Sequence, residues 1–205
     1  LGEDGATHQC VEDLALMSAI PGMVVVNPCD GPEMRKAVKA LLDYEGPAYL
    51  RLGRMAVVSV TDETPGYEFT LGKAALLRDG SDVTLAATGL MVQRALAAAD
   101  ILAAKGLSAR VLDIHTIKPL DTEAILAAAR DTGCIVTSEE HSIIGGLGSA
   151  VAAVCAENCP VPVVRHGVMD EFGRSGKALE VLEHYGLTAE VMAEKAERAI
   201  ALKKK

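Results

Sequence analysis

The sequence predicts an α/β fold in which the strands of mostly parallel sheets alternate with helices, and three observations predict it. Short apolar runs alternate along the chain with longer segments whose apolar residues recur at helical spacing. Half of the 205 residues are hydrophobic but only 3% are aromatic, so we expect a core of Ala, Val, Leu and Ile. Gly, Pro or Asp stands at many of the changes between segments, as expected for helix caps and turns.

The first part of the chain predicts an incomplete sheet domain followed by a linker. Asp30, with Pro32 shortly after it, predicts the start of a helix, because Asp caps helix N-termini and Pro is tolerated in the first turn. The order strand, helix, strand is the crossover unit of a parallel sheet. The predicted helix, strand, helix, strand and linker occupy residues 11–18, 23–26, 30–45, 48–52 and 59–66.

The remainder predicts a complete domain with a doubly wound, mostly parallel sheet. Asp121 predicts a helix N-cap, and Gly106 and Gly133 predict helix ends. Strands that alternate with helices of about 10–15 residues are typical of such sheets. The predicted strands are residues 82–88, 109–114, 134–137 and 161–164, and the predicted helices are residues 91–105, 121–131, 149–157 and 188–202.

Net charge, hydropathy and cysteine content indicate which partners and which cellular compartment to expect. The net charge is −8, and a chain this acidic gains nothing from neutralising a phosphate backbone, so we expect no nucleic-acid partner. No apolar run approaches the roughly 20 residues of a membrane span, so we expect no membrane partner. The five cysteines are scattered and odd in number, which favours reduced thiols in the cytoplasm.

Two polar segments are candidates for chemistry. Residues 2–9, Gly-Glu-Asp-Gly-Ala-Thr-His-Gln, place two carboxylates and a histidine directly before a predicted helix. They are either a substrate site or a polar loop in which Asp4 or Thr7 caps the helix. Residues 51–54, Arg-Leu-Gly-Arg, follow a predicted parallel strand, where ligands bind, and an Arg there can bind a phosphate or remain solvated.

Two further features have structural and functional interpretations. Residues 145–148, Gly-Gly-Leu-Gly, lie between a predicted strand and a predicted helix, where free backbone N–H groups could bind an anion. Tight packing of strand against helix is the favoured interpretation, because the segment is not a dinucleotide-binding fingerprint. His141 lies beside two glutamates and could be a proton shuttle or a ligand, but we predict a structural hydrogen bond.

These segments together resemble the transketolase family of thiamine diphosphate enzymes. Residues 2–9 match the family's GEDGxTHQ signature. Residues 1–64 resemble the second half of the pyrimidine-binding domain plus the linker, and residues 65–205 resemble the C-terminal domain. The further segments that carry the resemblance are residues 12–15, 20–23, 28–30, 87–89, 113–121, 139–141, 145–149 and 172–176.

The resemblance implies an activity and three site residues. Transketolases transfer a two-carbon ketol unit between sugar phosphates, as in the pentose phosphate pathway. The residues that match Asp4 and His8 contact sugar hydroxyls near the reacting carbons, and the residue that matches Arg54 binds the sugar phosphate. A histidine that holds or relays a hydroxyl proton is useful near neutral pH, so His8 is the candidate catalytic residue.

The sequence also departs from the family in what it lacks. The family's cofactor-activating Glu lies upstream of residues 2–9, and no G-D-G-x-x-N-like metal signature occurs in the chain, so we assign no cofactor-binding or metal-binding residue. We expect thiamine diphosphate and Mg²⁺ to bind the complete enzyme and not this chain alone, since the chain begins with Leu and resembles a fragment. The implied partners are an N-terminal transketolase half or subunit, sugar phosphate substrates and a second copy in a homodimer.

Two other interpretations remain open. The chain could be part of a 1-deoxy-D-xylulose-5-phosphate synthase or the β subunit of a 2-oxoacid dehydrogenase. The Arg-Leu-Gly-Arg strand end speaks against a synthase, because those enzymes carry a Tyr-Pro-Arg-Gly type segment there. The chain could also be a non-catalytic docking or regulatory domain on a similar α/β frame.

Overall fold

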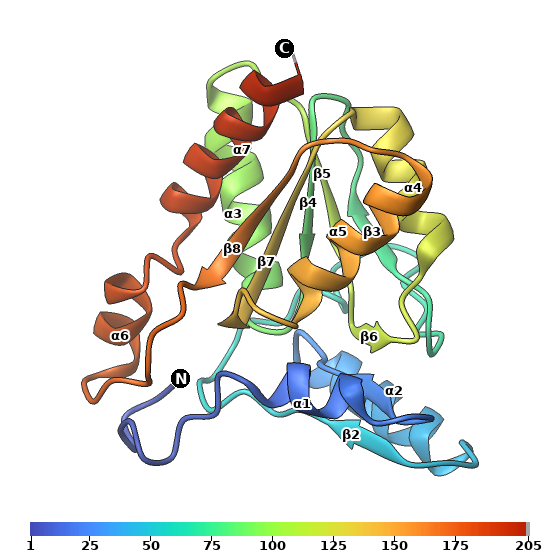
Figure 1. Ribbon diagram of the computed structural model, residues 1–205, viewed down its shortest axis with the longest axis vertical. Coiled ribbons are helices and arrows are strands. Elements are labelled where there is room, and N and C mark those ends of the chain that lie inside the picture. The colour runs from blue at the N-terminus through green and yellow to red at the C-terminus, as the bar shows by residue number, and fades with distance from the viewer. Residues whose placement is uncertain (204–205) are drawn as a thin grey trace.

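The computed structural model describes residues 1–203 and confirms an α/β fold built on two sheets (Figure 1). The smaller sheet has the strand order β2-β1-β6, and the larger has the order β3-β5-β4-β7-β8. The strands are β1 (Val24–Val26), β2 (Ala48–Leu50), β3 (Ala75–Arg78), β4 (Val83–Ala87), β5 (Ala109–Asp113), β6 (Thr116–Lys118), β7 (Ile135–Ser142) and β8 (Val163–Val168). The helices are α1 (Asp13–Ala19), α2 (Gly31–Leu42), α3 (Met91–Ala104), α4 (Thr122–Thr132), α5 (Leu147–Asn158), α6 (Ala178–His184) and α7 (Ala189–Lys203).

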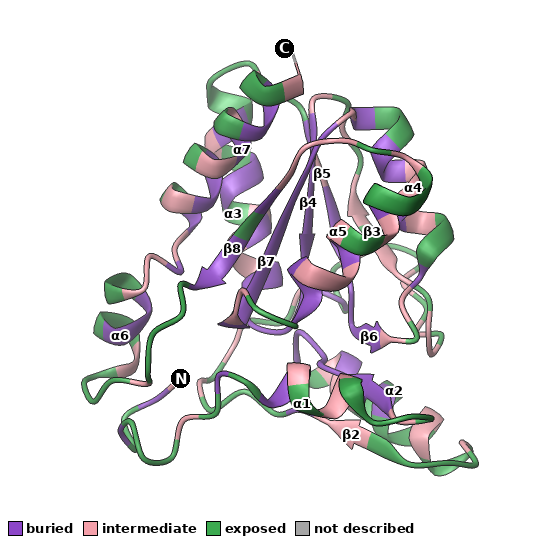
Figure 2. Ribbon diagram, in the orientation of Figure 1, coloured by how far each residue is buried: buried purple, intermediate pink, exposed green. Residues whose placement is uncertain are grey.

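The larger sheet is doubly wound, as the sequence predicts. Strands β4, β5, β7 and β8 pair in parallel, and β3 adds an antiparallel edge. Helices α3 and α7 cover one face, and α4 and α5 cover the other (Figure 1). All of β4 is buried (Figure 2). Its consecutive residues Leu85 and Ala86 belong to two separate hydrophobic clusters. Successive strand side chains point to opposite faces, so each face of the sheet has its own core.

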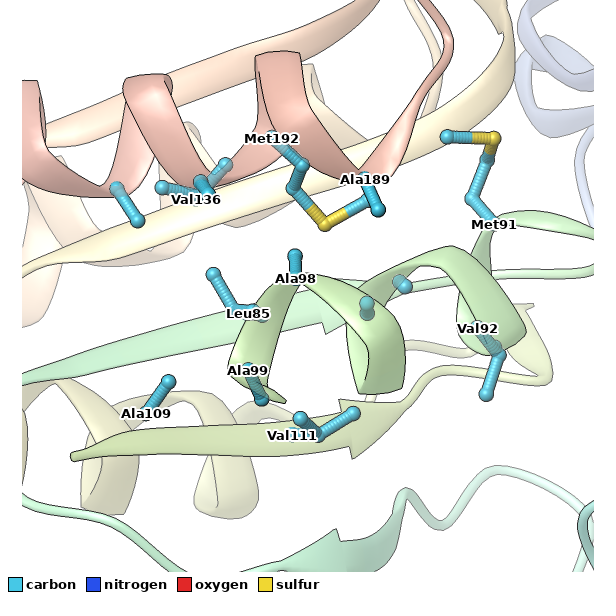
Figure 3. Close-up of a cluster of buried hydrophobic side chains, with 14 of the residues drawn as sticks. Leu85, Met91, Val92, Ala98, Ala99, Ala109, Val111, Val136, Ala189 and Met192 are labelled. Atoms are coloured by element: carbon cyan, nitrogen blue, oxygen red, sulfur yellow. The ribbon is translucent and has the colours of Figure 1, made fainter. Parts of the chain in front are cut away.

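Alanine allows the helices of this core to approach closely. Ala98 and Ala99 of α3 are buried between α7 and the sheet, and Met192 of α7 points toward Ala98 (Figure 3). Leu85 and Val111 fill the space from the strands. Small side chains on the helices and branched ones on the strands therefore form the core that the composition predicts.

The smaller sheet holds the N-terminal part of the chain in place. Strand β1 pairs in parallel with β2, and α2 connects them. Asp30 caps α2, because one of its carboxylate oxygens accepts a hydrogen bond from the backbone N–H of Glu33 at 2.8 Å. The other accepts the backbone N–H groups of Val60 and Thr61 at 2.7 and 2.8 Å. One cap residue thus starts the helix and fixes the predicted linker.

Three elements are absent from the sequence-based prediction. Strand β3 forms an antiparallel edge, α6 follows β8, and β6 pairs with β1 in antiparallel orientation. Strands β3 and β6 are only four and three residues long and are held by partners distant in sequence, so local spacing carries little signal for them. Because β6 joins the smaller sheet, residues on both sides of the expected boundary at 64–65 share one sheet. That boundary stays a prediction.

Membrane-spanning helices and the state of the cysteines can be checked in the described part of the chain. Among residues 1–203, the structure contains no helix that is both long and apolar enough to cross a membrane. All five cysteines are free thiols. Cys29, Cys134 and Cys155 are buried, as expected of small core residues.

Candidate active site

The structure brings the three predicted site residues to one pocket. Asp4 and His8 lie on the loop that precedes α1, and Arg54 follows β2. All three line a pocket of about 360 Å³ that opens beside the smaller sheet. Arg51, from the same strand end as Arg54, also lines it. Residues separated by more than 40 positions in sequence thus face one space.

Asp4 and Arg54 form an exposed ion pair in this pocket. The Arg54 Nε donates to Asp4 Oδ2 at 2.7 Å, and the side chains are 67% and 44% exposed, respectively. The hydrogen bond from Arg54 lowers the pKa of the Asp4 carboxyl, which is therefore ionised at neutral pH. A Cβ atom at Gly2 would lie 2.6 Å from Arg54 Cγ, so the Arg54 side chain crosses this loop where only glycine leaves room. Two opposite charges are available to a ligand at the pocket mouth.

His8 lies on the exposed side of the same loop. Its Nδ1 is 3.0 Å from the Thr7 hydroxyl oxygen, and its backbone N–H donates to the Gly5 carbonyl at 3.0 Å. The loop therefore makes a tight turn that places the imidazole beside Asp4 at the pocket. Neutral imidazole carries one donor and one acceptor nitrogen, so His8 can hold or move the proton of a hydroxyl group.

A second motif, residues 172–176, supports this loop from the other end of the chain. The Gln9 side chain donates to the Arg174 carbonyl at 2.8 Å and accepts from the Arg174 N–H at 2.9 Å. The backbone N–H of Ala6 donates to the Ser175 hydroxyl at 3.3 Å. Both segments carry the family resemblance, but nothing in their spacing predicts that they touch.

Arg51 is buried beneath the pocket, and its hydrogen bonds hold three segments together. Its Nε donates to Asp13 Oδ2 at 2.8 Å, and its Nη2 donates to the carbonyls of Cys10 and Glu140 at 3.1 and 3.0 Å. The Tyr49 hydroxyl also donates to Asp13 Oδ2, at 2.8 Å. Burial opposes ionisation, but Arg51 and Tyr49 outweigh it and hold the pKa of Asp13 below its ordinary value. Sequence reasoning missed Asp13 and Tyr49, although the position of Tyr49, two residues before Arg51 on one strand, was an available signal.

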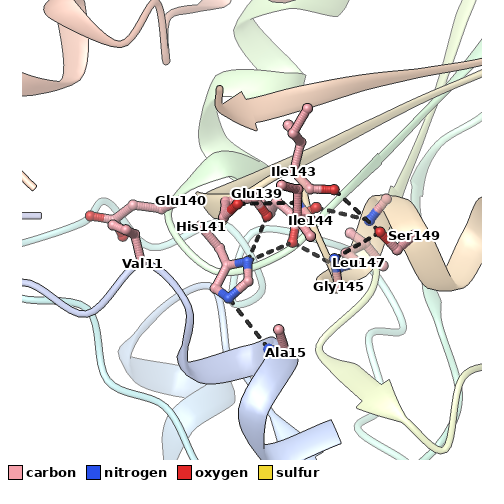
Figure 4. Close-up of polar contacts among 12 residues, drawn as sticks. Val11, Ala15, Glu139, Glu140, His141, Ile143, Ile144, Gly145, Leu147 and Ser149 are labelled. Carbon is pink, nitrogen blue, oxygen red and sulfur yellow. Dashed lines mark hydrogen bonds and ion pairs between the residues drawn. The ribbon is translucent and has the colours of Figure 1, made fainter. Parts of the chain in front are cut away.

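The glycine-rich turn before α5 binds the carboxylate of Glu139, a side chain of the same protein. The Glu139 carboxylate accepts the backbone N–H groups of Leu147 and Gly148 at 2.7 and 2.8 Å (Figure 4). A Cβ atom at Gly146 would lie 2.0 Å from Glu139 Oε2, so glycine is required for this approach. Burial raises the pKa of Glu139 to about 7, although the two N–H groups favour its ionised form. The turn thus packs strand against helix, as predicted, around a buried carboxylate.

His141 has the structural role that the sequence predicts. Its ring is buried, with Nδ1 2.7 Å from the Ser142 carbonyl and Nε2 accepting the backbone N–H of Ala15 at 3.4 Å (Figure 4). The histidine connects β7 to α1, which follows the candidate substrate loop. Its burial lowers its pKa, so the imidazole is neutral at pH 7.

Two family models cover most of the chain and define its class. The model of the transketolase pyrimidine binding domain matches residues 1–59, and the model of the transketolase C-terminal domain matches residues 72–192. The chain therefore belongs to the transketolase family, which is thiamine diphosphate-dependent. This confirms the resemblance and the fold class inferred from the sequence.

Individual relatives include subunits of transketolases. The chain is 50% identical over 186 residues to the 6-deoxy-6-sulfo-D-fructose transketolase subunit SqwH of Clostridium sp. (strain MSTE9), covering 91% of this chain and 57% of that protein. It is 49% identical over 189 residues to an apulose-4-phosphate transketolase subunit of Phocaeicola vulgatus, covering 92% of this chain and 60% of that protein. The chain thus spans less than two thirds of these curated relatives.

A solved structure shares the same fold over nearly the whole chain. It is described as a split gene transketolase, inactive beta4 tetramer, and it superposes with a TM-score of 0.89 at 46% identity. The match covers 97% of this chain and 64% of that one.

The one group of three potential metal-ligating side chains found among residues 1–203 does not fit a Mg²⁺–diphosphate site. Among residues 1–203, one group of three side chains brings metal-binding atom types together, namely Cys29, Glu33 and Asp113, all buried. Mg²⁺ bound with a diphosphate takes oxygen ligands and keeps several waters, which a buried thiol and two buried carboxyls do not provide. We therefore derive no step of the reaction through the cofactor from these residues.

Proposed function

We propose that this chain is the C-terminal part of a transketolase that transfers a two-carbon ketol unit between sugar phosphates. The observation that carries the proposal is the convergence of Asp4, His8 and Arg54 on one pocket. Two relatives support an anionic substrate, because their names specify a sulfo sugar and a sugar phosphate. The free thiols agree with a cytoplasmic enzyme.

Each residue has a separate role in this proposal. Arg54 binds the terminal phosphate, using the guanidinium N–H groups that remain beside its bond to Asp4. Asp4 accepts a hydrogen bond from one sugar hydroxyl, and the wrong epimer leaves that carboxylate unpaired. His8 holds or relays a hydroxyl proton near the reacting carbons.

A partner supplies what this chain lacks. Because the sequence carries no G-D-G-x-x-N-like signature and the buried Cys29–Glu33–Asp113 cluster does not suit Mg²⁺, we place thiamine diphosphate and Mg²⁺ with an N-terminal transketolase half or subunit. We expect this chain alone to be inactive, and to associate with a second copy as a homodimer. The relative described as an inactive beta4 tetramer supports inactivity and self-association, although its assembly has four copies and not two.

Reconstitution tests the proposal. The chain is assayed for ketol transfer with and without its N-terminal partner, in the presence of thiamine diphosphate and Mg²⁺. Activity is expected only for the mixture, and turnover by the chain alone would overturn the assignment of the cofactor to the partner. Light scattering of the chain alone should give a dimer or a higher oligomer, and a monomer at high concentration would contradict self-association.

Two variants of the reconstituted enzyme test the roles of the loop residues. His8→Ala should lower kcat/KM for phosphorylated and unphosphorylated substrates alike, by roughly 10²-fold or more. Asp4→Ala should mainly reduce the discrimination between hydroxyl epimers. If His8→Ala leaves every rate intact, the proposed role of His8 is wrong; the loop is not a helix cap either, because α1 begins after Glu12 and no side chain in the described part of the chain caps it.

A synthase of 1-deoxy-D-xylulose 5-phosphate is the alternative that the relatives favour. The chain is 41% identical over 194 residues to such a synthase of Heliobacterium modesticaldum, of which it covers 30%. A donor assay separates the two functions, because a synthase takes its two-carbon unit from pyruvate and a transketolase takes it from a ketose phosphate.

A further inference from the structure

A cluster of buried acidic groups, none of which lines the candidate active-site pocket, lies between α2 and the end of β5. It consists of Cys29 before α2, Glu33 in the first turn of α2, and Asp113 at the end of β5. The Sγ atom and the carboxylate oxygens of these residues lie within 4.8 Å of one another. Glu33 and Asp113 are both fully buried.

The two carboxyl groups differ in their hydrogen-bond partners. Glu33 accepts the backbone N–H of Cys29 at 2.6 Å and the hydroxyl of Tyr67, so donors face both of its oxygens. Among the described residues, neither oxygen of Asp113 has a hydrogen-bond partner. A buried acceptor without a donor is costly, and the one group beside Asp113 with strong acceptor capacity is the Glu33 carboxylate. The Cys29 thiol also lies beside Asp113 but is only a weak donor, so a proton held by Asp113 itself supplies the hydrogen bond between the two carboxyl groups.

Among residues 1–203, no cation forms an ion pair with Glu33 or Asp113 that would compensate a second negative charge. The Asp30 carboxylate, at the N-cap of α2, also faces the cluster, but its oxygens already accept hydrogen bonds from four donor groups. His115 lies between β5 and β6 and stacks on Phe69. Burial lowers the pKa of His115, so its imidazole is neutral at pH 7. The Lys36 ammonium is exposed and lies over the outer ring face of Tyr67, 4.4 Å from its centroid.

The thiol and phenol of the cluster are also uncharged. Burial, with the nearby carboxylates, raises the pKa of Cys29 and of Tyr67, so both act as neutral groups. Asp121 acts on His115 from the start of α4 and adds negative charge. Two ionised carboxylates would thus face each other in a buried site of like charge, which is strongly unfavourable.

We propose that Glu33 and Asp113 share one proton, and that this carboxylic acid–carboxylate hydrogen bond fastens α2 to the end of β5. The proton resides on Asp113, which donates to Glu33. Strand β5 leads directly into β6, and β6 pairs with β1, so this bond closes a ring of contacts between the two sheets. The bond holds α2, and with it the smaller sheet, against the C-terminal part.

The proposal predicts a specific pH dependence of stability. Burial and the Glu33 charge raise the pKa of Asp113 well above its ordinary value. The folded chain then binds a proton that the unfolded chain releases near pH about 3.9, so stability falls as pH rises from there through the folded pKa of Asp113. Asp113→Asn should remove this dependence, because the Asn amide donates to Glu33 at every pH.

The test compares denaturation of the complete chain, its Asp113→Asn variant and an Asp62→Asn control, between about pH 5 and pH 9. Asp62 is exposed, so its substitution removes a charge without touching the cluster. The denaturation midpoints of the wild type and the control should fall relative to that of Asp113→Asn as pH rises. Parallel pH profiles for all three would overturn the proposal.

Infrared spectroscopy tests the proton directly and remains decisive if Asp113→Asn does not fold. The wild-type chain should retain the C=O band of a protonated carboxylic acid above about pH 8, where the Glu139 carboxyl is largely ionised. Absence of that band would overturn the proposal. So would one tightly bound equivalent of zinc in the purified chain, because a metal ion would then replace the shared proton.

Discussion

Arg51 and Arg54 are three residues apart at the same strand end, yet they occupy opposite environments. Arg51 is 8% exposed and donates to a carboxylate and two backbone carbonyls, whereas the Arg54 side chain is 67% exposed and donates to Asp4. The first guanidinium makes three hydrogen bonds to the protein, and the second makes one and keeps its other N–H groups for a ligand or water. Identical side chains at one strand end therefore divide into a structural group and a ligand-binding candidate.

The difference follows from the surroundings of each arginine. Arg51 lies where α1, β2 and β7 converge, and without it the backbone carbonyls of Cys10 and Glu140 would lose a buried donor. Arg54 borders the pocket, where water is an adequate alternative partner. Substitution of Arg51 should thus affect stability, and substitution of Arg54 should affect substrate binding. If both substitutions change the same quantity, the distinction between the two arginines is wrong.

The largest effect is expected from Arg51→Ala. It leaves Asp13 ionised and buried beside Tyr49 alone, and removal of one partner from a buried ion pair costs about 3–5 kcal/mol. Chemical denaturation of the isolated chain measures this loss of stability. A decrease below about 1 kcal/mol would show that water replaces the guanidinium and that Arg51 is not structural.

Arg54→Ala should leave stability nearly unchanged and instead impair binding. In the reconstituted enzyme, KM for phosphorylated substrates should rise by roughly tenfold to hundredfold, because a charge-assisted hydrogen bond to the phosphate is lost. Unphosphorylated acceptors make no such contact and serve as the control. If all substrates are slowed equally, Arg54 positions the loop through Asp4 and does not bind phosphate.

The sequence predicted those parts of the fold that have local causes. The N-caps Asp30 and Asp121 each accept the expected backbone N–H, and Gly133 ends α4 with φ of 70°. These features depend on residues within one helical turn. Strand β6 was missed because its pairing with β1 joins segments about 90 residues apart, which no local pattern records.

The site shows the same division. Residues 2–9 and Arg54 were chosen from their motifs, and the structure places them at one pocket, but their roles stay predictions. Nothing in the Arg-Leu-Gly-Arg segment distinguishes Arg51 from Arg54, because both follow the same strand. The distinction is made by Asp13, on a different element, whose carboxylate lies within reach of only one of them.

The smallest effect is expected from Tyr49→Phe, which tests how much Tyr49 adds to the stabilisation of the Asp13 carboxylate by Arg51. Asp13 Oδ2 then loses one donor at 2.8 Å but keeps the Arg51 Nε, so the chain should lose about 0.5–1.5 kcal/mol of stability. The native pKa of Asp13 is lowered in part by Tyr49, so it should rise toward its ordinary value in the variant.

The sign of the pH effect follows from that change. A lowered native pKa contributes stability that is present above the unfolded value of about 3.9 and is lost as pH falls through the native pKa. The variant has less of this stability to lose, so the wild-type and variant free energies of unfolding should converge on acidification. Denaturation at a series of pH values from about 6 downward measures both free energies. A constant difference between them would show that the Tyr49 hydroxyl contributes independently of the charge on Asp13, and that Arg51 alone compensates that buried charge.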